Sequence, residues 1–294
     1  MNLDRLLAHF DRISEAPDAI PRLRSFILEL AVHGRLVEPE PHDRPVSELL
    51  ERIQAEKTRL EKSNAIRNQV PLPPVDKCSI SFSVPRHWAW LRLGDVGVLS
   101  GGMTPSKNRS DFWEGDINWF SPKDIKSDEL VESELKITSA GVAETGLQLY
   151  QPGCLFMVAR SGILKRTFPV AVNRVEATAN QDLKVLAPFL RGMERYLQIM
   201  FRGMTRFILA TLVKTGTTVQ SFKYDEFEQQ LLPIPPLAEQ HRIVAKVEEL
   251  TALCDRLEAK LTTAQTESRR LLEALLQEAL NPVAESGDAA RSHV

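Results

Sequence analysis

The clearest hydrophobic pattern in this chain follows the proline-rich stretch 233–236. Residues 237–281 contain neither glycine nor proline. Apolar and small residues recur through them at alternating spacings of four and three, or about 3.5 residues per repeat, which is the pattern of a coiled-coil seam. This spacing predicts one long helix whose seam is buried against another helix of this chain, a second copy or a different protein. The predicted seam positions are Ile243, Val247, Leu250, Cys254, Leu257, Leu261, Leu271 and Leu275.

Helical spacing also marks the N-terminal part of the chain. Apolar residues three and four apart predict a first helix over residues 3–13 and a second helix that follows Pro17. The second helix has Pro21 in its first turn and Gly34 as its C-terminal stop. A third helix is predicted from about Ser47, a residue type that favours the N-cap position.

Between residues 84 and 233 the pattern changes to short apolar runs that are separated by turns. We predict strands at 88–91, 96–99, 154–158 and 169–172, and a helix near 193–212. The sequence therefore predicts an α+β protein, in which a mixed α/β domain is flanked by N-terminal helices and one long C-terminal coiled-coil helix. The predicted domain organisation of the chain is a helical region at 1–69, a proline-rich linker at 70–83, the mixed domain at 84–233, the long helix at 234–281 and a disordered tail at 282–294.

Composition and charge narrow the possible functions. The 294 residues carry a formal net charge of −2, which excludes a uniformly basic nucleic-acid binder, but residues 160–223 hold 11 basic and only 3 acidic side chains. The three cysteines lie far apart in the sequence, which argues against a disulfide framework or a zinc site. No apolar run approaches the ~20 residues of a membrane span, and the N-terminus does not resemble a signal peptide. We therefore expect a cytoplasmic protein with no membrane partner.

The basic segment is the best candidate for a binding surface. Its cations lie among hydroxyl groups and glycines, a mixture that suits phosphate binding because cations neutralise charge while hydroxyl and amide groups fix the register. A solvated helix face is the alternative, above all for 191–206. The four tryptophans are interpreted as core residues rather than as platforms for bases. The candidate DNA-contacting residues are Thr104, Ser106, Lys107, Arg160, Ser161, Lys165, Arg166, Lys214, Thr215, Thr217, Thr218 and Lys223.

The sequence contains no phosphate-binding loop, dinucleotide-binding turn, zinc-protease motif or nucleophile elbow, and we assign no catalytic or metal-binding residue. An enzymatic function remains an alternative because the sequence contains two acid-x-lysine triplets. The triplets are Glu134-Leu135-Lys136 and Asp182-Leu183-Lys184, and with Asp124 or Asp116 either one could imitate the metal site of a self-sufficient nuclease. The simpler interpretation of both triplets is charge that faces solvent. A further alternative is an adaptor or decoy scaffold that does not bind DNA.

The predicted long helix begins with a stretch that resembles a known protein family. Residues 232–244 (LPIPPLAEQHRIV), with 246–250 (KVEEL) and 253–258 (LCDRLE), resemble the conserved region of type I restriction-modification specificity (S) subunits. Other stretches resemble a target recognition domain and the N-terminal segment of the same family. These stretches are 26–31 (FILELA), 34–37 (GRLV), 87–95 (HWAWLRLGD), 102–106 (GMTPS), 119–124 (WFSPKD), 180–182 (NQD) and 216–218 (GTT).

The resemblance implies a non-catalytic DNA-recognition subunit, with its target recognition domain at 84–233. Such a subunit directs methyltransferase (M) and restriction (R) subunits to a bipartite site in double-stranded DNA. S-adenosylmethionine, ATP and magnesium are then expected on those partner subunits, and no cofactor in this chain. Members usually carry two recognition domains in a chain nearly twice as long, so this chain resembles a half-length form. We expect it to form a homodimer or to pair with another S chain through the helix seam.

Overall fold

The computed structural model describes residues 18–66, 82–214, 216 and 219–280. They fall into two compact units, one containing 18–24 and 249–280 and the other containing 25–248. The predicted first helix, most of the proline-rich linker and the polar tail lie outside the described residues. None of the helices in the described ranges combines the length and the apolar character that crossing a bilayer requires.

Two helices precede the mixed domain, α3 (Ala19–Val32) and α4 (Val46–Lys62). The predicted stop after α3 is confirmed, because Gly34 has a φ of 64° and the N–H groups of Gly34 and Arg35 donate to the carbonyl groups of Ala31 and Leu30. The predicted N-cap of α4 was wrong. Pro45 takes that position with φ −61° and ψ 149°, and its fixed φ lets the helix begin before Ser47.

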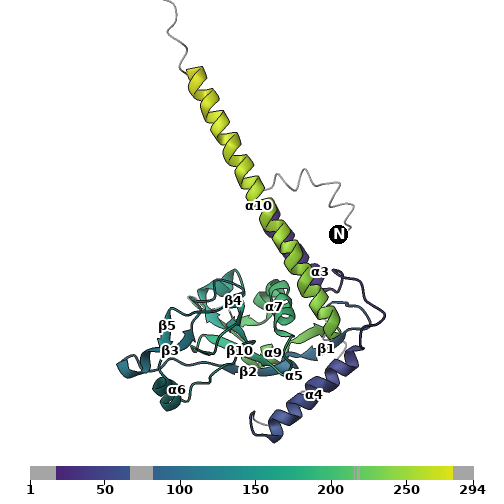
Figure 1. The fold of residues 1–294 in the computed structure, drawn as a ribbon, viewed down its shortest axis with the longest axis vertical. Helices are drawn as coiled ribbons and strands as arrows, with labels where there is room; N and C mark the ends of the chain where they lie inside the picture. Colours follow the sequence, from purple (N-terminus) through teal and green to yellow (C-terminus); the bar gives the residue numbers. More distant parts are fainter. Residues whose placement is uncertain (1–17, 67–81, 215, 217–218, 281–294) are drawn as a thin grey trace, which may run out of the picture. The chain divides into compact units, whose positions relative to one another are not determined.

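A five-stranded sheet lies at the centre of the larger unit (Figure 1). Two of its three inner strands, β6 and β8, are buried at every position, which explains why they appear in the sequence as unbroken apolar runs. The order of the strands is β2 (Gly97–Gly101), β10 (Leu183–Pro188), β6 (Leu155–Val158), β8 (Val170–Asn173) and β4 (Glu129–Leu130). The predicted strands at 96–99, 154–158 and 169–172 are thereby confirmed.

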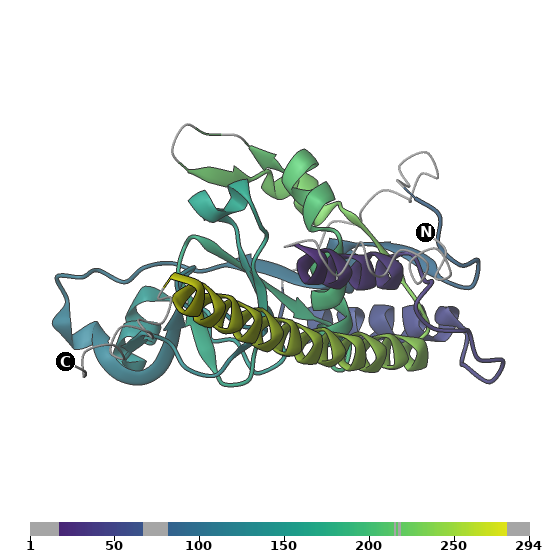
Figure 2. The ribbon, with the colours of Figure 1, turned by 90° about the horizontal axis from the view of Figure 1, so that it is seen from above.

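Three smaller sheets complete the strand pattern. The strand predicted at 88–91 is confirmed as β1 (Ala89–Arg92), which pairs with β13 (Leu231–Ile234). A second sheet has the order β5 (Leu135–Ile137), β3 (Trp113–Phe120) and β9 (Ala177–Ala179). The third has the order β11 (Val213–Lys214), β12 (Gln220–Phe222) and β7 (Arg160–Ser161). Figure 2 shows the hairpin of β11 and β12 extending away from the larger sheet.

The helix predicted near 193–212 is present as α7 (Glu194–Gly203) and α8 (Thr205–Thr211). A cluster of phenylalanine rings forms the core beside it, in which Phe168 contacts Phe201, Phe222 and Phe227 at centroid distances of 5.0 to 6.1 Å. The remaining short helices are α5 (Leu93–Val96), α6 (Ser139–Thr145), α9 (Tyr224–Glu228) and the 3-10 turns η2 (Ser110–Phe112) and η3 (Gly162–Lys165). These elements confirm the predicted α+β class.

The long C-terminal helix is confirmed as α10 (Leu237–Leu280), a single helix of 44 residues. Burial of the predicted seam decreases along it. Ile243, Val247 and Cys254 are buried, whereas Leu271 and Leu275 are 67% and 63% exposed. Leu250, Leu257 and Leu261 are half-buried. The C-terminal part of the seam therefore has no cover within the described residues, and the coiled coil itself stays a prediction.

Candidate nucleic-acid interface

Two indole rings hold the loop at 101–107 in place. The indole N–H of Trp119 donates to the carbonyl of Met103 at 3.0 Å, and that of Trp113 donates to the carbonyl of Ser106 at 3.2 Å. The two rings meet edge to face, with centroids 5.3 Å apart. Trp119 is buried and Trp113 is half-buried. Both N–H groups are thus used to fix the loop. Trp119 is a core residue, as the sequence interpretation expected, whereas Trp113 packs against the core and is only half-buried.

The same loop lies directly against residues 179–182. Gly102 approaches the carbonyl of Ala179 so closely that any Cβ at this position would overlap it, which explains the glycine. The N–H of Met103 donates to that carbonyl at 3.0 Å, and the hydroxyl of Thr104 donates to the side-chain oxygen of Gln181. Two of the stretches that carry the family resemblance, 102–106 and 180–182, are therefore neighbours in space although almost eighty residues separate them.

A row of polar side chains crosses the small sheet β11-β12-β7. In its register Lys214 lies opposite Ser221, and Ser221 lies opposite Arg160. Directly opposed residues of antiparallel strands project from the same face, so the two cations flank one hydroxyl group. Both cations are exposed, and neither has a carboxylate partner in the part of the chain that the structure describes. We call Arg160, Ser221 and Lys214 the basic row.

The other candidate residues differ in how far the fold already uses them. Lys107, Lys165 and Arg166 are exposed. The Ser161 hydroxyl accepts the N–H of Ile163 at 3.3 Å and so caps η3. The Lys223 ammonium donates to the Thr211 carbonyl at 3.0 Å and lies 3.1 Å from a Glu226 carboxylate oxygen, which partly neutralises its charge. Thr215, Thr217 and Thr218 lie outside the described residues.

The α7 arginines follow the alternative interpretation of a structural or solvated face. Arg195 pairs with Glu248 at 2.8 Å, and Arg202 pairs with Asp128 at 2.6 Å. On the nearby sheet edge, Arg174 pairs with Glu129 at 2.5 Å and keeps the pKa of that carboxyl below its usual value. These arginines are thus already paired within the fold, in contrast to the cations of the basic row.

Asp124, one of the two aspartates considered for a nuclease site, holds a loop in place. One of its carboxylate oxygens accepts the N–H and the hydroxyl of Ser121 at 2.8 and 2.7 Å, and the other accepts the N–H of Glu134 at 2.9 Å. Three protein donors thus bind this carboxylate, and each of its oxygens accepts at least one of them. Within the described ranges, no three side chains of His, Cys, Asp or Glu gather in a way that could hold a metal ion.

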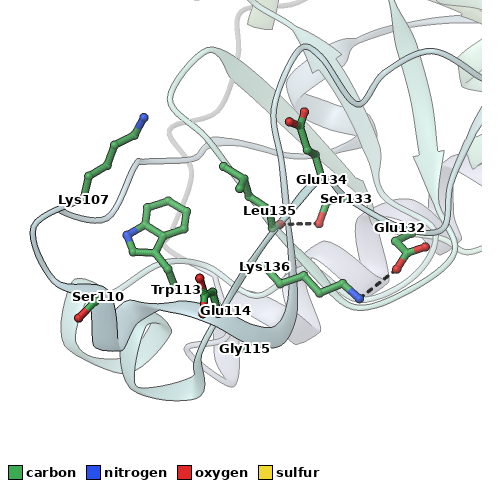
Figure 3. A pocket seen from close by; sticks show the side chains of 10 residues that line it. All are labelled: Lys107, Ser110, Trp113, Glu114, Gly115, Glu132, Ser133, Glu134, Leu135 and Lys136. Carbon is green, nitrogen blue, oxygen red and sulfur yellow. Dashed lines mark hydrogen bonds and ion pairs between the residues drawn. The ribbon is translucent and has the colours of Figure 1, made fainter.

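An open hollow of about 800 Å³ lies between the loop at 101–107 and strand β5 (Figure 3). Charges of both signs surround it, and Lys136 pairs with Glu132 at 3.1 Å. The backbone of β3 is distorted here, since Glu114 has a φ of 63° and the register to β5 shifts between Trp113 and Ile117. The lining residues are Lys107, Ser110, Trp113, Glu114, Gly115, Glu132, Ser133, Glu134, Leu135 and Lys136.

Comparison with protein families identifies the part of the chain that contains these features. Residues 85–264 match the family model described as the type I restriction modification DNA specificity domain. This chain belongs to that family. The match includes the loop at 101–107, the basic row and the first turns of α10, so it covers every stretch from residue 87 onward that carried the resemblance in the sequence. The stretches 26–31 and 34–37 lie outside the matched residues.

Known specificity subunits are similar along most of this chain. The EcoAI type I restriction enzyme specificity subunit of Escherichia coli is 30% identical over 294 residues, which cover 95% of this chain and 48% of that protein. The EcoR124I/EcoR124II specificity subunit of Escherichia coli is 35% identical over 169 residues, which cover 57% of this chain and 42% of that protein. The chain thus spans about half the length of the curated relatives it matches.

A solved structure of a type I R-M system contains a chain with a related fold. The TM-score is 0.53 at 18% sequence identity, and the alignment covers 94% of this chain and 57% of that chain. At this level of identity the similarity concerns the fold alone. It supports the mixed α+β fold class of this chain.

The family match also includes a buried polar junction that our sequence interpretation missed. Glu239, in the first turn of α10, is only 1% exposed. One of its carboxylate oxygens accepts the indole N–H of Trp88 at 3.0 Å, and the other lies 2.8 Å from Nε2 of His87. In the sequence, the one hint of this junction was that His87-Trp88 and Glu239 both lie in stretches that resemble the family.

A second contact supports the same turn of α10. The guanidinium of Arg242 forms two bonds to the carboxylate of Asp43, at 2.9 and 2.5 Å, and keeps the pKa of Asp43 below its usual value. Glu239 and Arg242 together fix the start of the long helix against the segment before α4 and the entry to the mixed domain. Two residues of the 232–244 stretch thus have a packing role within this fold.

We expect Glu239→Ala to lower the free energy of unfolding by about 2 kcal/mol, because the buried indole N–H of Trp88 then loses its acceptor. Urea unfolding followed by tryptophan fluorescence measures this change. Glu273→Ala, an exposed position on the same helix, is the matched control and should change stability by less than about 0.5 kcal/mol. Equal effects of the two substitutions would contradict a stabilising role for the junction.

Proposed function

We propose that this chain is the DNA-recognition subunit of a type I restriction-modification complex. It would bind double-stranded DNA and direct methyltransferase and restriction subunits to a bipartite target, without catalysis of its own. The observation that carries the proposal is the basic row, two exposed cations without carboxylate partners in a domain of the DNA specificity family. Such cations are available to neutralise phosphates, which supplies most of the affinity of a DNA-binding surface.

The candidate residues divide by the part of the DNA that they suit. Phosphate contacts would come from Arg160, Lys165, Arg166 and Lys214, with Lys107 from the loop at 101–107. The hydroxyl groups of Ser106 and Ser161 would fix the register through shorter contacts. The Thr104 hydroxyl already donates to Gln181, so it would contact DNA only as an acceptor. Lys223 is the weakest member of the set, because its ammonium already contacts Glu226. The recognition domain in this proposal spans 84–233.

The partner subunits would supply the chemistry. S-adenosylmethionine, ATP and magnesium would bind to the methyltransferase and restriction subunits, and the assembled complex would act on DNA in the cytoplasm. Helix α10 would provide part of the docking surface for these subunits. The carboxylate of Asp124 already accepts three hydrogen bonds from the fold, which gives no support to an independent nuclease site in this chain.

The exposed part of the α10 seam favours self-association. Five leucines near the end of the helix are each more than half exposed, a large unburied apolar area for one helix. We propose that it packs against the same segment of a second copy in antiparallel orientation, with pairing to another S chain as the alternative. A two-fold axis would then present two recognition domains to two half-sites. The five leucines are Leu271, Leu272, Leu275, Leu276 and Leu280.

A gel-shift experiment with and without the cognate methyltransferase subunit tests the proposal. The chain is expected to retard double-stranded DNA, and the methyltransferase is expected to increase the affinity for DNA that carries the target. A complex that assembles but leaves DNA unbound would favour an adaptor or decoy scaffold. Incubation of the purified chain with DNA and magnesium should leave the DNA intact, and cleavage under these conditions would contradict a non-catalytic role.

A further inference from the structure

Lys184 lies at the point where the segments of the candidate interface meet. It sits on β10, opposite Gly101 of β2 on one side and Met157 of β6 on the other. The loop at 101–107 begins at Gly101. Strand β6 leads through Ala159 into Arg160, and the N–H groups of both these residues donate to the carbonyl of Asp182, at 2.8 and 3.1 Å. Both loops therefore leave the central sheet beside Lys184.

The chain after β12 forms the third segment beside Lys184, and Tyr224 is the residue that contacts it. The ammonium nitrogen of Lys184 lies 4.2 Å from the centroid of the Tyr224 ring, and the Tyr224 hydroxyl donates to the carbonyl of Leu99 at 3.2 Å. A Cβ at Gly101 would lie 3.0 Å from the same nitrogen, so the absence of a side chain at Gly101 leaves room for the ammonium. The cation is thus held in one place by a ring and a strand.

Lys184 has no anionic partner to balance its charge. No carboxylate pairs with it among the residues that the structure describes, although its side chain is half-buried. Partial burial lowers the pKa of Lys184, because water is removed from the charged form and no anion replaces it. An anion that approached this ammonium would interact more strongly than with a fully solvated lysine, since the surroundings screen the charge less.

We propose that Lys184 binds a phosphate group of the DNA backbone and that Tyr224 positions its ammonium for this contact. The proposal rests on the proposed DNA-recognition function and deepens it. It assigns a contact to a residue that the sequence interpretation grouped with a chance acid-x-lysine triplet. The glycine at 101 fits this arrangement, because a side chain there would make a tight contact with the ammonium.

Lys184→Gln in the full chain tests the assignment directly. The probe is a DNA duplex of mixed sequence, titrated at several salt concentrations with and without the methyltransferase subunit. We expect affinity at low salt to fall about tenfold and the slope of log affinity against log salt to decrease by about 0.9, the value for one lost phosphate contact. Lys184→Met, which keeps the apolar stem of the side chain, should give the same result. Lys62→Gln, at an exposed position on α4, is the matched control and should change neither quantity.

Two variants of Tyr224 separate positioning from packing. Tyr224→Phe keeps the ring face beside the ammonium and should keep the affinity and the salt slope within twofold of the unsubstituted chain. Tyr224→Leu removes the ring and should reproduce most of the loss seen in Lys184→Gln. Unchanged affinity and slope in both Lys184 variants, with DNA binding by the unsubstituted chain, would overturn the Lys184 assignment and leave the proposed function standing. Failure of the unsubstituted chain to bind DNA would overturn the proposed function itself.

Discussion

Replacing Arg160 and Lys214 together by alanine is expected to weaken binding to double-stranded DNA by about a hundredfold at low salt. The two side chains flank Ser221 on one face of the small sheet, so they are placed to contact neighbouring phosphates. Loss of two such contacts should also reduce the slope of log affinity against log salt by about 1.8. Fluorescence anisotropy with a labelled duplex at several salt concentrations measures both quantities.

The matched control is the double variant Arg195→Ala with Arg202→Ala. It removes the same charge from the same basic segment, but both arginines are already paired, with Glu248 and Asp128. Its salt slope should stay within about 0.3 of the slope of the unsubstituted chain. If the control lowers the slope as much as the Arg160 and Lys214 variant does, the effect belongs to net charge and the basic row is not a specific contact surface.

The second large effect is expected at the exposed end of α10. Leu271→Glu with Leu275→Glu should weaken self-association by at least about a thousandfold, because each leucine buried in a dimer contributes about 2 kcal/mol and the substitution adds like charges across the interface. Sedimentation velocity should show a dimer for the unsubstituted chain and a monomer for the variant at the same concentration.

The double variant Thr266→Glu with Gln277→Glu is the control for the added negative charge. Both positions are exposed on α10 and lie outside the predicted seam. This variant should remain dimeric. A variant at Leu271 and Leu275 that also remains dimeric would show that the seam is not the interface. An unsubstituted chain that is monomeric at high concentration would exclude the homodimer and leave pairing with another S chain.

The elements that depend on local pattern were predictable from the sequence. Helix α10 followed from 45 residues without glycine or proline and a regular apolar spacing, and its observed bounds agree with that pattern within a few residues. Strands β6 and β8 followed from unbroken apolar runs, because strands that are covered on both faces need no polar side. The stop at Gly34 followed from the need for a left-handed residue after a helix.

Features that depend on distant pairing were not predictable in this way. Strand β3 was not among the predicted strands, although Trp113, Ile117 and Trp119 alternate with polar residues in its sequence. The shift in its register to β5 between Trp113 and Ile117 depends on pairing with a distant segment, which the sequence does not show. The basic row joins three strands whose residues lie up to 61 positions apart, and no spacing in the sequence encodes that register. Lys184 was left out of the candidate set because its neighbours Gly101 and Tyr224 come from distant segments.

Sequencing the methylome of cells that express this chain with its methyltransferase subunit tests the central claim most directly. The account predicts methylation at one bipartite DNA motif, with two identical half-sites in inverted orientation if the chain acts as a homodimer. The motif should disappear when this chain is deleted and the methyltransferase is kept. Methylation that is unchanged by the deletion would contradict the claim that this chain reads the DNA sequence.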